Sequence, residues 1–389
     1  MISFDNTEIA FQSKSNNDLN RAYWLFKIIG NPRLVKAGKW ATNTALSLRL
    51  PINGLIKKTI FRQFCGGETI SECKGAIDTL EKFGIGTILD YSIEGKTKDE
   101  DFDATVEEII ATIETAAKQK NIPFAVFKIT GIGRFEYLEK ANAGIENLAD
   151  SELKAYDMIV SRIEKICSAA FENSVPLFID AEETWIQQAI DRITIDMMRK
   201  YNKNRAIVYN TLQMYRHDRL AFLMSEIEIA RAEGFHYGVK LVRGAYMEKE
   251  RQRAIDKGYP SPIQPNKIAC DADFNRALEI IIDNIDIMTL CSGSHNENSA
   301  LLLSELMAKK GLEKSDERIY CAQLLGMSDH ISYNMAHAGY HVAKYVPYGP
   351  VKEVMPYLLR RADENTSVAG QTGRELSLII AERKRRKLN

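Results

Sequence analysis

The sequence has no excess charge of either sign. Its 389 residues include 52 Lys and Arg side chains and 52 Asp and Glu side chains, so the formal net charge is zero. A nucleic-acid-binding protein needs a basic surface that neutralises phosphates, so this balance argues against nucleic acid as a partner. One basic run, Arg383 to Lys387, follows the last apolar segment. We interpret it as a solvated, frayed terminus, with contact to an anionic membrane surface as the alternative.

The sequence also lacks paired cysteines, a targeting segment and a long hydrophobic run. The amino terminus has neither an apolar signal core nor an arginine-rich presequence, and no apolar run is long enough to span a bilayer. We therefore expect a cytoplasmic protein, in peripheral contact with the inner face of the membrane at most; a processed mitochondrial protein is the alternative. No C-x-x-C pair occurs, which predicts reduced thiols in the protein core at Cys65, Cys73, Cys167, Cys270, Cys291 and Cys321.

Motifs for metal, phosphate and nucleophile chemistry are absent or incomplete. His337 and His341 are four residues apart, but Gly339 interrupts the helix between them and no H-E-x-x-H sequence is present, so we predict no metal site. Gly131 and Gly133 lack the third glycine of a dinucleotide-binding loop. No G-x-S-x-G or Cys/His nucleophile arrangement supports acyl transfer. We therefore expect an organic cofactor to carry out the central step of the reaction.

Short apolar runs rich in β-branched residues recur along the chain, each followed by a longer amphipathic segment. Near-continuous apolar strands separated by helices predict a parallel sheet that is buried on both faces. Eight such units fit an α/β fold of the (βα)8 TIM-barrel type better than a doubly wound sheet, because such barrels have ~250 residues. The eight predicted strands are 86–91, 124–129, 175–180, 206–210, 238–242, 287–291, 318–321 and 342–345.

The first part of the chain shows helical periodicity and no strong strand. We predict helices at 19–29, 41–48, 59–64 and 69–83, and between the strands at 150–172, 184–200, 219–233 and 298–309. The predicted organisation is a helical arm or cap over residues 1–84 followed by a catalytic barrel over residues 85–389.

Polar residues occur at seven predicted strand ends. In a barrel of this type the carboxyl ends of the strands form the active-site mouth. A single polar residue there is often a helix cap or a satisfied core group, but seven consecutive strand ends favour a site. They are Lys128, Asp180, Gln213, the run from Arg243 to Tyr246, the run from Ser294 to Asn296, Gln323 with Leu324, and Tyr345 closing the last strand.

A second polar feature follows the last strand. Tyr357, Arg360, Arg361 and Glu364 fall at i, i+3, i+4 and i+7, so a helix would present all four on one face. Considered without the rest of the chain, this face is interpreted as a solvated surface with a weak Arg360–Glu364 ion pair. Beside a site it reads as a carboxylate clamp, because two guanidinium forks donate parallel hydrogen bonds to a carboxylate. We favour the second interpretation and predict a small carboxylate-bearing substrate.

Together these segments resemble those of proline dehydrogenases, flavin enzymes that oxidise L-proline to Δ1-pyrroline-5-carboxylate. The matching segments occur in order along the whole barrel: Phe178–Glu183, Tyr209–Tyr215, Lys240–Tyr246, Ser294–Asn296, Gln323–Met327 and Tyr357–Asn365. The family has a distorted (βα)8 barrel whose last helix lies over the mouth. The resemblance therefore implies FAD as cofactor, L-proline as substrate, and a membrane quinone as electron acceptor.

The resemblance also implies roles for individual residues. Arg360 and Arg361 match the residues that bind the proline carboxylate, and Glu364 and Lys128 would orient them through ion pairs. The remaining pocket wall would be Asp180, Leu324, Tyr345 and Tyr357. FAD would be held by Gln213, Lys240, Val242, Gly244, Ala245, Tyr246, Gly293, Ser294, His295 and Asn296. Hydride would pass from the ring carbon next to nitrogen to the flavin, with positioning supplying much of the rate.

Some positions differ from the family pattern. Lys240 stands where many bacterial members have arginine, Arg243 stands where they have lysine, and the segment from Tyr259 to Asp271 matches poorly. The bulk of Tyr357 favours proline over hydroxyproline, and the barrel looks monofunctional. Alternatives are another flavin-dependent barrel oxidoreductase, such as a methylenetetrahydrofolate reductase-like enzyme or a hydroxyproline dehydrogenase, and a non-catalytic barrel that acts as a scaffold.

Overall fold

A computed structural model describes residues 2–31, 33–38, 40, 53–93, 96–367 and 371–388. The side chains of residues 53, 55, 362–367, 371 and 372 lie outside this description. The predicted helix at 41–48 falls outside it as well. Among the described residues, no helix combines the length and the apolar character needed to cross a membrane.

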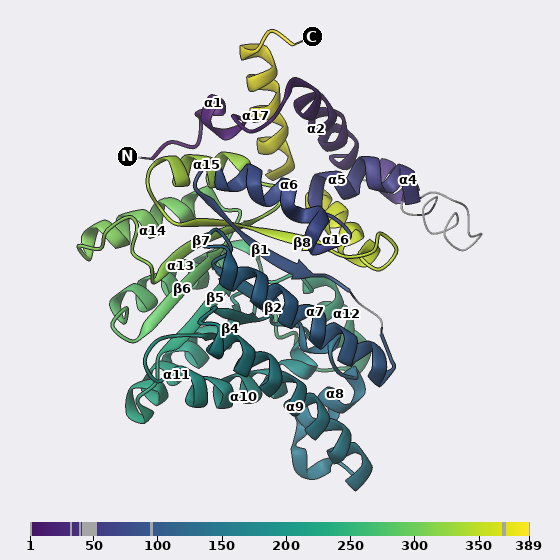
Figure 1. Ribbon diagram of the computed structural model, residues 1–389, viewed down its shortest axis with the longest axis vertical. Helices are drawn as coiled ribbons and strands as arrows, with labels where there is room; N and C mark the ends of the chain where they lie inside the picture. Colours follow the sequence, from purple (N-terminus) through teal and green to yellow (C-terminus); the bar gives the residue numbers. More distant parts are fainter. Residues whose placement is uncertain are drawn as a thin grey trace. The chain divides into compact units, whose positions relative to one another are not determined.

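The eight strands follow one another around a closed parallel barrel, in the order of the chain (Figure 1). Each predicted strand is confirmed, although the ends differ by a few residues. Every strand is followed by at least one helix or turn that returns the chain to the next strand, as a parallel barrel requires. The strands are β1 (Ile85–Tyr91), β2 (Phe124–Phe127), β3 (Leu177–Ile179), β4 (Val208–Gln213), β5 (Tyr237–Val242), β6 (Met288–Gly293), β7 (Ile319–Leu324) and β8 (Val342–Tyr348).

By internal contacts the chain divides into two compact units, residues 1–94 with 323–389 and residues 95–322. These units do not test the predicted boundary between a helical arm over residues 1–84 and a barrel over residues 85–389, so that boundary stays a prediction. The second unit contains the helices α7 (Asp99–Lys118), α8 (Phe135–Ala143), α9 (Asp150–Glu172), α10 (Thr184–Tyr201), α11 (Arg219–Glu233), α12 (Met247–Lys257), α13 (Lys267–Asp283) and α14 (Glu297–Lys309). The predicted helices at 150–172, 184–200, 219–233 and 298–309 are thus confirmed.

The interior of this second unit contains a cluster of aromatic rings. Phe124 stacks on Phe178 with ring centroids 4.4 Å apart, and the edges of Tyr209 and Tyr320 meet Phe124 at 5.6 and 4.9 Å. Phe124 lies on β2 and Tyr320 on β7, two strands that are not neighbours, so these rings fill the space inside the curved sheet. They form a packed floor below the carboxyl ends of the strands, which is the usual arrangement in such barrels.

The first unit combines segments from both ends of the sequence. It contains α1 (Thr7–Ala10), α2 (Asn16–Ile29), α4 (Asn53–Ile56), a π-helical turn (Lys57–Phe61), α5 (Arg62–Phe64), α6 (Ile70–Glu81), α15 (Asp329–His337), α16 (Met355–Ser367) and α17 (Gln371–Arg385). Helix α2 begins at a capping box formed by Ser15 and Asp18. Its buried residues Leu19, Ala22 and Phe26 pack with Leu378 and Ile379 of α17.

The basic run near the end of the chain is ordered, so the prediction of a frayed terminus was wrong. Helix α17 continues to Arg385, and Arg385 and Arg386 both pair with the fully buried Glu382, at 2.8 and 2.6 Å. Arg386 also donates hydrogen bonds to the backbone carbonyls of Phe11 and Lys14. A buried carboxylate needs such partners, and it therefore holds these arginines against the first turns of the chain.

The six cysteines are all buried and free, as predicted. Burial raises the pKa of Cys73, Cys291 and Cys321 to about 12. These thiols stay protonated at neutral pH and belong to the packed core.

Candidate functional site

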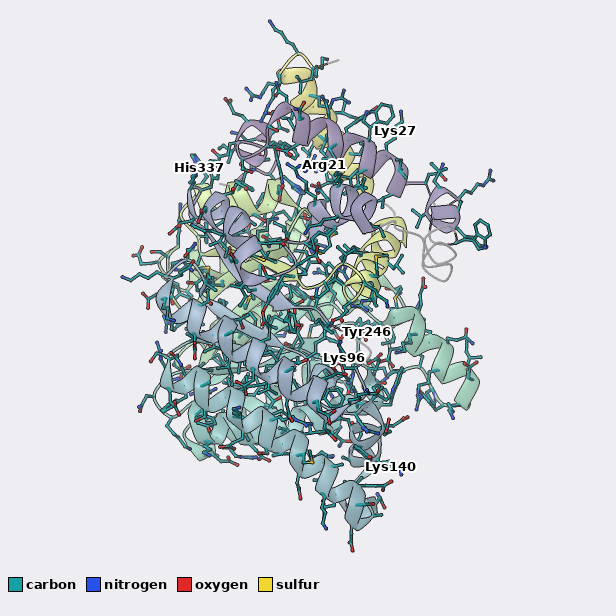
Figure 2. All side chains as sticks on the ribbon, turned by 45° about the vertical axis from the view of Figure 1, so that its right-hand side comes forward. Arg21, Lys27, Lys96, Lys140, Tyr246 and His337 are labelled. Carbon is teal, nitrogen blue, oxygen red and sulfur yellow. The ribbon has the colours of Figure 1, made fainter. Side chains whose placement is uncertain are left out.

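The residues predicted to hold a cofactor gather at the carboxyl ends of three neighbouring strands, β4, β5 and β6, which are paired in parallel. Gln213, Val242 and Gly293 are the last residues of these strands. Gly244 and Ala245 form the exposed turn after β5, and Tyr246, labelled in Figure 2, precedes α12. The turn from β6 to α14 consists of Ser294, His295 and Asn296. The structure thus brings the predicted set together along one edge.

The turn at Gly244 can exist only with glycine. Its φ of +129° is a conformation that residues with a side chain rarely adopt, and a Cβ atom there would come within 2.5 Å of the Tyr215 ring. Tyr215 is itself fixed, because its backbone donates to the Arg243 carbonyl and accepts from Gln264. The result is an exposed stretch of bare backbone above a buried ring. Such a stretch lets a large ligand approach the peptide groups closely, so these residues fit a bound dinucleotide.

Arg243 connects the turns after β5 and β6. Its guanidinium donates to Asp271, to the Ser294 hydroxyl at 2.7 Å and to the Ser299 hydroxyl at 2.9 Å, and it lies 4.2 Å from the Phe274 ring centroid. Ser294 in turn accepts from the backbone of Asn296, the N-cap of α14. Arg243 therefore fixes the start of α14. The sequence indicated a charge at this position but not Asp271 as its partner.

Lys240 and Asp180 form a buried ion pair below this edge. Lys240 lies on β5, Asp180 directly follows β3, and their side chains are 8% and 14% exposed. The Lys240 ammonium also lies 5.3 Å from the centroid of the Phe178 ring in the aromatic floor. A charge pair in this position is held by both the carboxylate and the ring face. Asp180 was predicted as pocket wall and Lys240 as cofactor ligand, and the structure shows that the two residues act on each other.

Glu182 was not singled out from the sequence, although it lies two residues after Asp180. Its carboxylate accepts hydrogen bonds from both the backbone and the hydroxyl of Thr130, in the turn that follows Lys128. Burial raises the pKa of Glu182 to about 7, against the opposing effects of the Thr130 hydrogen bond and the Lys128 charge. Glu182 thus fixes the position of the turn at Lys128, and its protonation changes near neutral pH.

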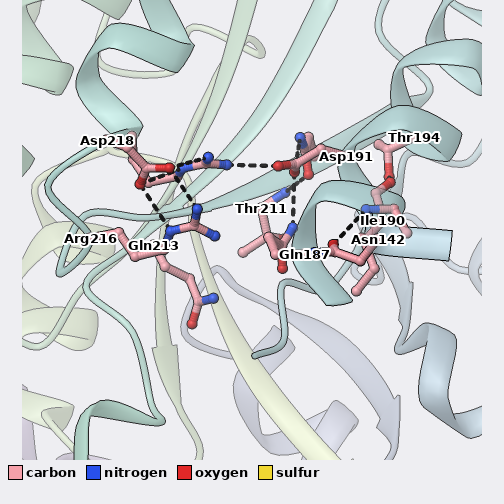
Figure 3. Close-up of polar contacts among 12 residues, drawn as sticks. Asn142, Gln187, Ile190, Asp191, Thr194, Thr211, Gln213, Arg216 and Asp218 are labelled. Carbon is pink, nitrogen blue, oxygen red and sulfur yellow. Dashed lines mark hydrogen bonds and ion pairs between the residues drawn. The ribbon is translucent and has the colours of Figure 1, made fainter. Parts of the chain in front are cut away.

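Gln213 is connected through the backbone of Glu182 to a polar network, and Figure 3 shows the part of this network around Asp191. The side-chain amide of Gln213 donates to the Glu182 carbonyl at 2.7 Å. The centre of the network is the buried Asp191 on α10, which accepts from Gln187, Asn210 and Arg219 at 2.9, 3.0 and 2.7 Å. Because these partners come from α10, β4 and α11, Asp191 fixes the spacing of three elements. The network explains why buried polar residues surround Gln213.

The predicted arginine face lies on α16, which confirms that residues 357–361 are helical. Tyr357 is buried in an apolar cluster with Phe61, Phe64 and Leu358. Arg361 is 8% exposed, and its guanidinium lies 5.2 Å from the centroid of the Tyr357 ring. Arg360 is only half-buried. Arg361 is therefore held against an aromatic face, whereas the side chain of Glu364, its predicted partner, lies outside the described residues.

Leu324 and Tyr345 lie on adjoining segments of β7 and β8. The backbone N–H of Leu325 donates to the Tyr345 carbonyl at 2.8 Å. Tyr345 was predicted to close the last strand, and this was wrong, because β8 continues through Pro347 to Tyr348. Parallel pairing with β1 places Tyr345 opposite Ile88, in the middle of the ladder. The proline does not end the strand because its carbonyl still accepts a hydrogen bond, from Gly66 at 2.9 Å.

The predicted site residues thus fall into two sets, each described within its own unit. Lys128, Asp180 and the cofactor set belong to residues 95–322, and Leu324, Tyr345, Tyr357, Arg360 and Arg361 belong to the other unit. That both sets serve one site stays a prediction.

Comparison with known proteins identifies the family of this chain. The family model for proline dehydrogenase matches residues 73–374, more than half of the chain. The mitochondrial proline dehydrogenase 1 of Dictyostelium discoideum is 32% identical over 98% of this chain and 74% of its own length. The hydroxyproline dehydrogenase of Xenopus laevis is 31% identical over 97% of this chain and 89% of its own length.

A similar fold occurs among solved structures. Proline utilization A (PutA) from Bdellovibrio bacteriovorus, inactivated by N-propargylglycine, matches 97% of this chain with a TM-score of 0.74 at 19% identity. The match covers 42% of that chain, so the present chain spans less than half its length. At this identity the likeness concerns the fold.

Proposed function

Because the chain belongs to the proline dehydrogenase family, we propose that it oxidises L-proline to Δ1-pyrroline-5-carboxylate with FAD as the cofactor and a membrane quinone as the final electron acceptor. The observation that carries the proposal is α16, which holds Arg361 against the buried ring of Tyr357 next to the half-buried Arg360. A charged guanidinium that is removed from water and oriented by a ring suits a planar carboxylate.

In this proposal the residues of α16 and β8 bind the amino acid. Arg360 and Arg361 take the carboxylate of proline in a two-pronged clamp, which ion pairs formed by the carboxylate of Glu364, one of them with Lys128, preorganise. Leu324, Tyr345 and Tyr357 close around the apolar ring and exclude water. The clamp leaves the ring carbon next to nitrogen in one fixed orientation, which is the main contribution of positioning to the rate.

FAD would be held by Gln213, Lys240, Val242, Gly244, Ala245, Tyr246, Gly293, Ser294, His295 and Asn296. The bare backbone at Gly244 and the rigid start of α14 fit a dinucleotide. When bound, the flavin accepts two electrons and a proton equivalent as hydride from the substrate carbon. The chain supplies the Lys240 ammonium, which Asp180 holds in place, and the Lys128 ammonium, whose charge favours a neutral amine on a neighbouring substrate.

A spectrum tests the proposal directly. The purified protein should be yellow, and L-proline should bleach its flavin absorption in the absence of air. A colourless protein, or a flavin that proline leaves oxidised, would contradict the proposal.

Arg361→Met tests the clamp itself. Loss of one guanidinium removes charge-assisted hydrogen bonds worth about 1.5–3 kcal/mol each, so proline binding should weaken about 10- to 100-fold or more. Flavin content should stay unchanged. The matched control is Arg231→Met, an exposed arginine of α11 that pairs with Asp286 at 2.7 Å. Equal losses of proline and flavin binding, or no loss of either, would remove Arg361 from the substrate role.

Hydroxyproline is the second candidate substrate, because one relative is a hydroxyproline dehydrogenase. Tyr357 is 5% exposed, and its bulk leaves little room for a ring hydroxyl. Tyr357→Ser should therefore raise kcat/KM for hydroxyproline relative to proline. A wild-type enzyme that already prefers hydroxyproline would reverse the assignment.

A further inference from the structure

Helix α12 is attached to its unit with little apolar packing. Of its eleven residues, all of which the structure describes, only Glu250 and Ala254 are buried, and Ile255 is 74% exposed. A helix in a globular protein normally gains its stability from an apolar face that packs on the core. Because α12 lacks such a face, polar contacts must determine where it lies.

Glu250 makes a polar contact that is completely buried. Its carboxylate accepts hydrogen bonds from the backbone N–H and the hydroxyl of Thr184, at 2.7 and 2.6 Å. Thr184 is the first residue of α10, and the side chain of Glu183, the N-cap of α10, makes no capping hydrogen bond. Glu250 therefore caps α10 from another helix, in a position where the helix dipole favours a carboxylate.

Two other side chains of α12 meet the same segment. Lys249 forms an ion pair with Glu183, and the Arg253 guanidinium lies 4.3 Å from the centroid of the Trp185 ring. The Lys249 side chain is 60% exposed, so water and salt screen its ion pair. The buried contact of Glu250 is therefore the strongest of the three.

Both segments that Glu250 joins lead to the candidate cofactor edge. The backbone N–H of Glu250 donates to the Tyr246 carbonyl at 2.9 Å, and Tyr246 ends the exposed turn after β5. On the other side, Thr184 lies four residues after Asp180, the partner of Lys240. One carboxylate thus links the turn after β5 to the turn after β3.

We propose that Glu250 is a positioning residue for the cofactor, because it holds the turn after β5 in the conformation that receives FAD. The proposal deepens the proposed function and rests on its assignment of FAD to this edge. Gly244 and Ala245 are exposed, so this turn depends on α12 for its position. Burying a carboxylate is costly, and an apolar side chain would attach α12 at a lower cost. The carboxylate instead fixes the direction and the length of the contact.

Flavin binding and amide hydrogen exchange test the proposal together. Glu250→Ala should raise the dissociation constant of FAD, measured by reconstitution of the flavin-free protein, about tenfold or more, because both hydrogen bonds to Thr184 are lost. Glu250→Gln keeps one acceptor and should lie between Glu250→Ala and the wild type. In the flavin-free protein, Glu250→Ala should also speed the exchange of residues 244–250 about tenfold or more. Excess FAD should restore kcat and leave KM for proline unchanged.

Glu248→Ala is the matched control, because Glu248 is an exposed glutamate in the same turn of the same helix. It should leave FAD binding and the exchange of residues 244–250 unchanged. Thr184→Val changes the other end of the contact and should weaken FAD binding in the same direction as Glu250→Gln. Far-UV circular dichroism shows that each variant is folded.

FAD binding by Glu250→Ala that is as tight as binding by Glu248→Ala would overturn the proposal. Faster exchange confined to the first turn of α10 would overturn it as well, because Glu250 would then act only as a cap. A wild-type chain that binds no FAD would contradict the proposed function instead. The exchange of residues 244–250 would still decide whether Glu250 anchors the turn.

Discussion

Lys344→Met should destabilise the protein strongly. Lys344 lies on β8 with its side chain 1% exposed, and its ammonium pairs with Asp329 at 2.8 Å and donates to the Met327 carbonyl at 2.6 Å. These contacts hold the turn between β7 and α15. Burial raises the pKa of Asp329, but the charges of Lys344 and Lys14 outweigh burial and lower this pKa to about 2. The Asp329 carboxylate is therefore charged at neutral pH, whereas burial lowers the pKa of Lys344 against the opposing charge of Asp329.

The magnitude follows from what the substitution leaves behind. Removing one partner of a buried ion pair costs about 3–5 kcal/mol of unfolding free energy, because the other charge stays buried. Asp329 would retain Lys14 at 3.3 Å, so the lower end, about 3 kcal/mol, applies. Lys14→Met is the matched control, because it removes the same kind of side chain from the same carboxylate. Lys14 is 26% exposed, and its loss should cost only about 1 kcal/mol or less.

Equilibrium urea unfolding followed by far-UV circular dichroism measures both variants. The dependence of the unfolding free energy on acidic pH provides a second test. The folded pKa of Asp329 lies below its unfolded value of 3.8, so this group stabilises the fold above that value and the contribution is lost as the pH falls toward about 2. The wild type should lose ~2.4 kcal/mol over this range from Asp329 alone. Lys344→Met should lose less over the same range. If Lys344→Met costs no more than Lys14→Met, the buried pair does not carry this stability.

Two further predictions concern the cofactor side. The pKa of Glu182 is raised to about 7 from 4.5, so the folded state binds the proton more tightly and the free energy of unfolding should fall as the pH rises between these values. Glu182→Gln should reduce this dependence of the unfolding free energy on pH, measured by urea unfolding. An unchanged pH dependence would refute the assignment. Gly244→Ala places a methyl group 2.5 Å from the Tyr215 ring at a strained φ, so most of the bound flavin should be lost in a flavin-content measurement. Gly311→Ala, at a φ of +73° with open space around it, is the control that should keep its flavin.

The barrel could be predicted from sequence because its signal is local. Each strand is an apolar run and each helix a periodic one, so 150–172 and 219–233 were predicted with the bounds observed for α9 and α11. The predicted strand 342–345 stopped short of the end of β8, which contains Pro347, a residue that usually ends a strand. In the fold Pro347 stays in the strand, because its carbonyl still accepts a hydrogen bond.

The positions of the site residues were predictable, but their partners were not. Strand-end residues such as Gln213 and Gly244 follow from the alternation of strands and helices. Their supports come from distant parts of the chain: Arg243 meets Asp271 and Ser299, and Arg386 meets the carbonyl of Phe11. Such pairs depend on tertiary packing, and charge alone in a sequence does not say which acid a given base will meet.

The division of the chain into units has a consequence for the order of events on the ribosome. Residues 95–322 are contiguous, so this unit can fold as soon as it has been synthesised, whereas the other unit needs β8 to pair with β1 and α17 to cover α2. Until the last residues emerge, Leu19 and Phe26 of the nascent chain have no permanent cover. We therefore expect ribosome-bound chains that stop before α17 to recruit chaperones at their amino-terminal helix, long before any of the chemistry is possible.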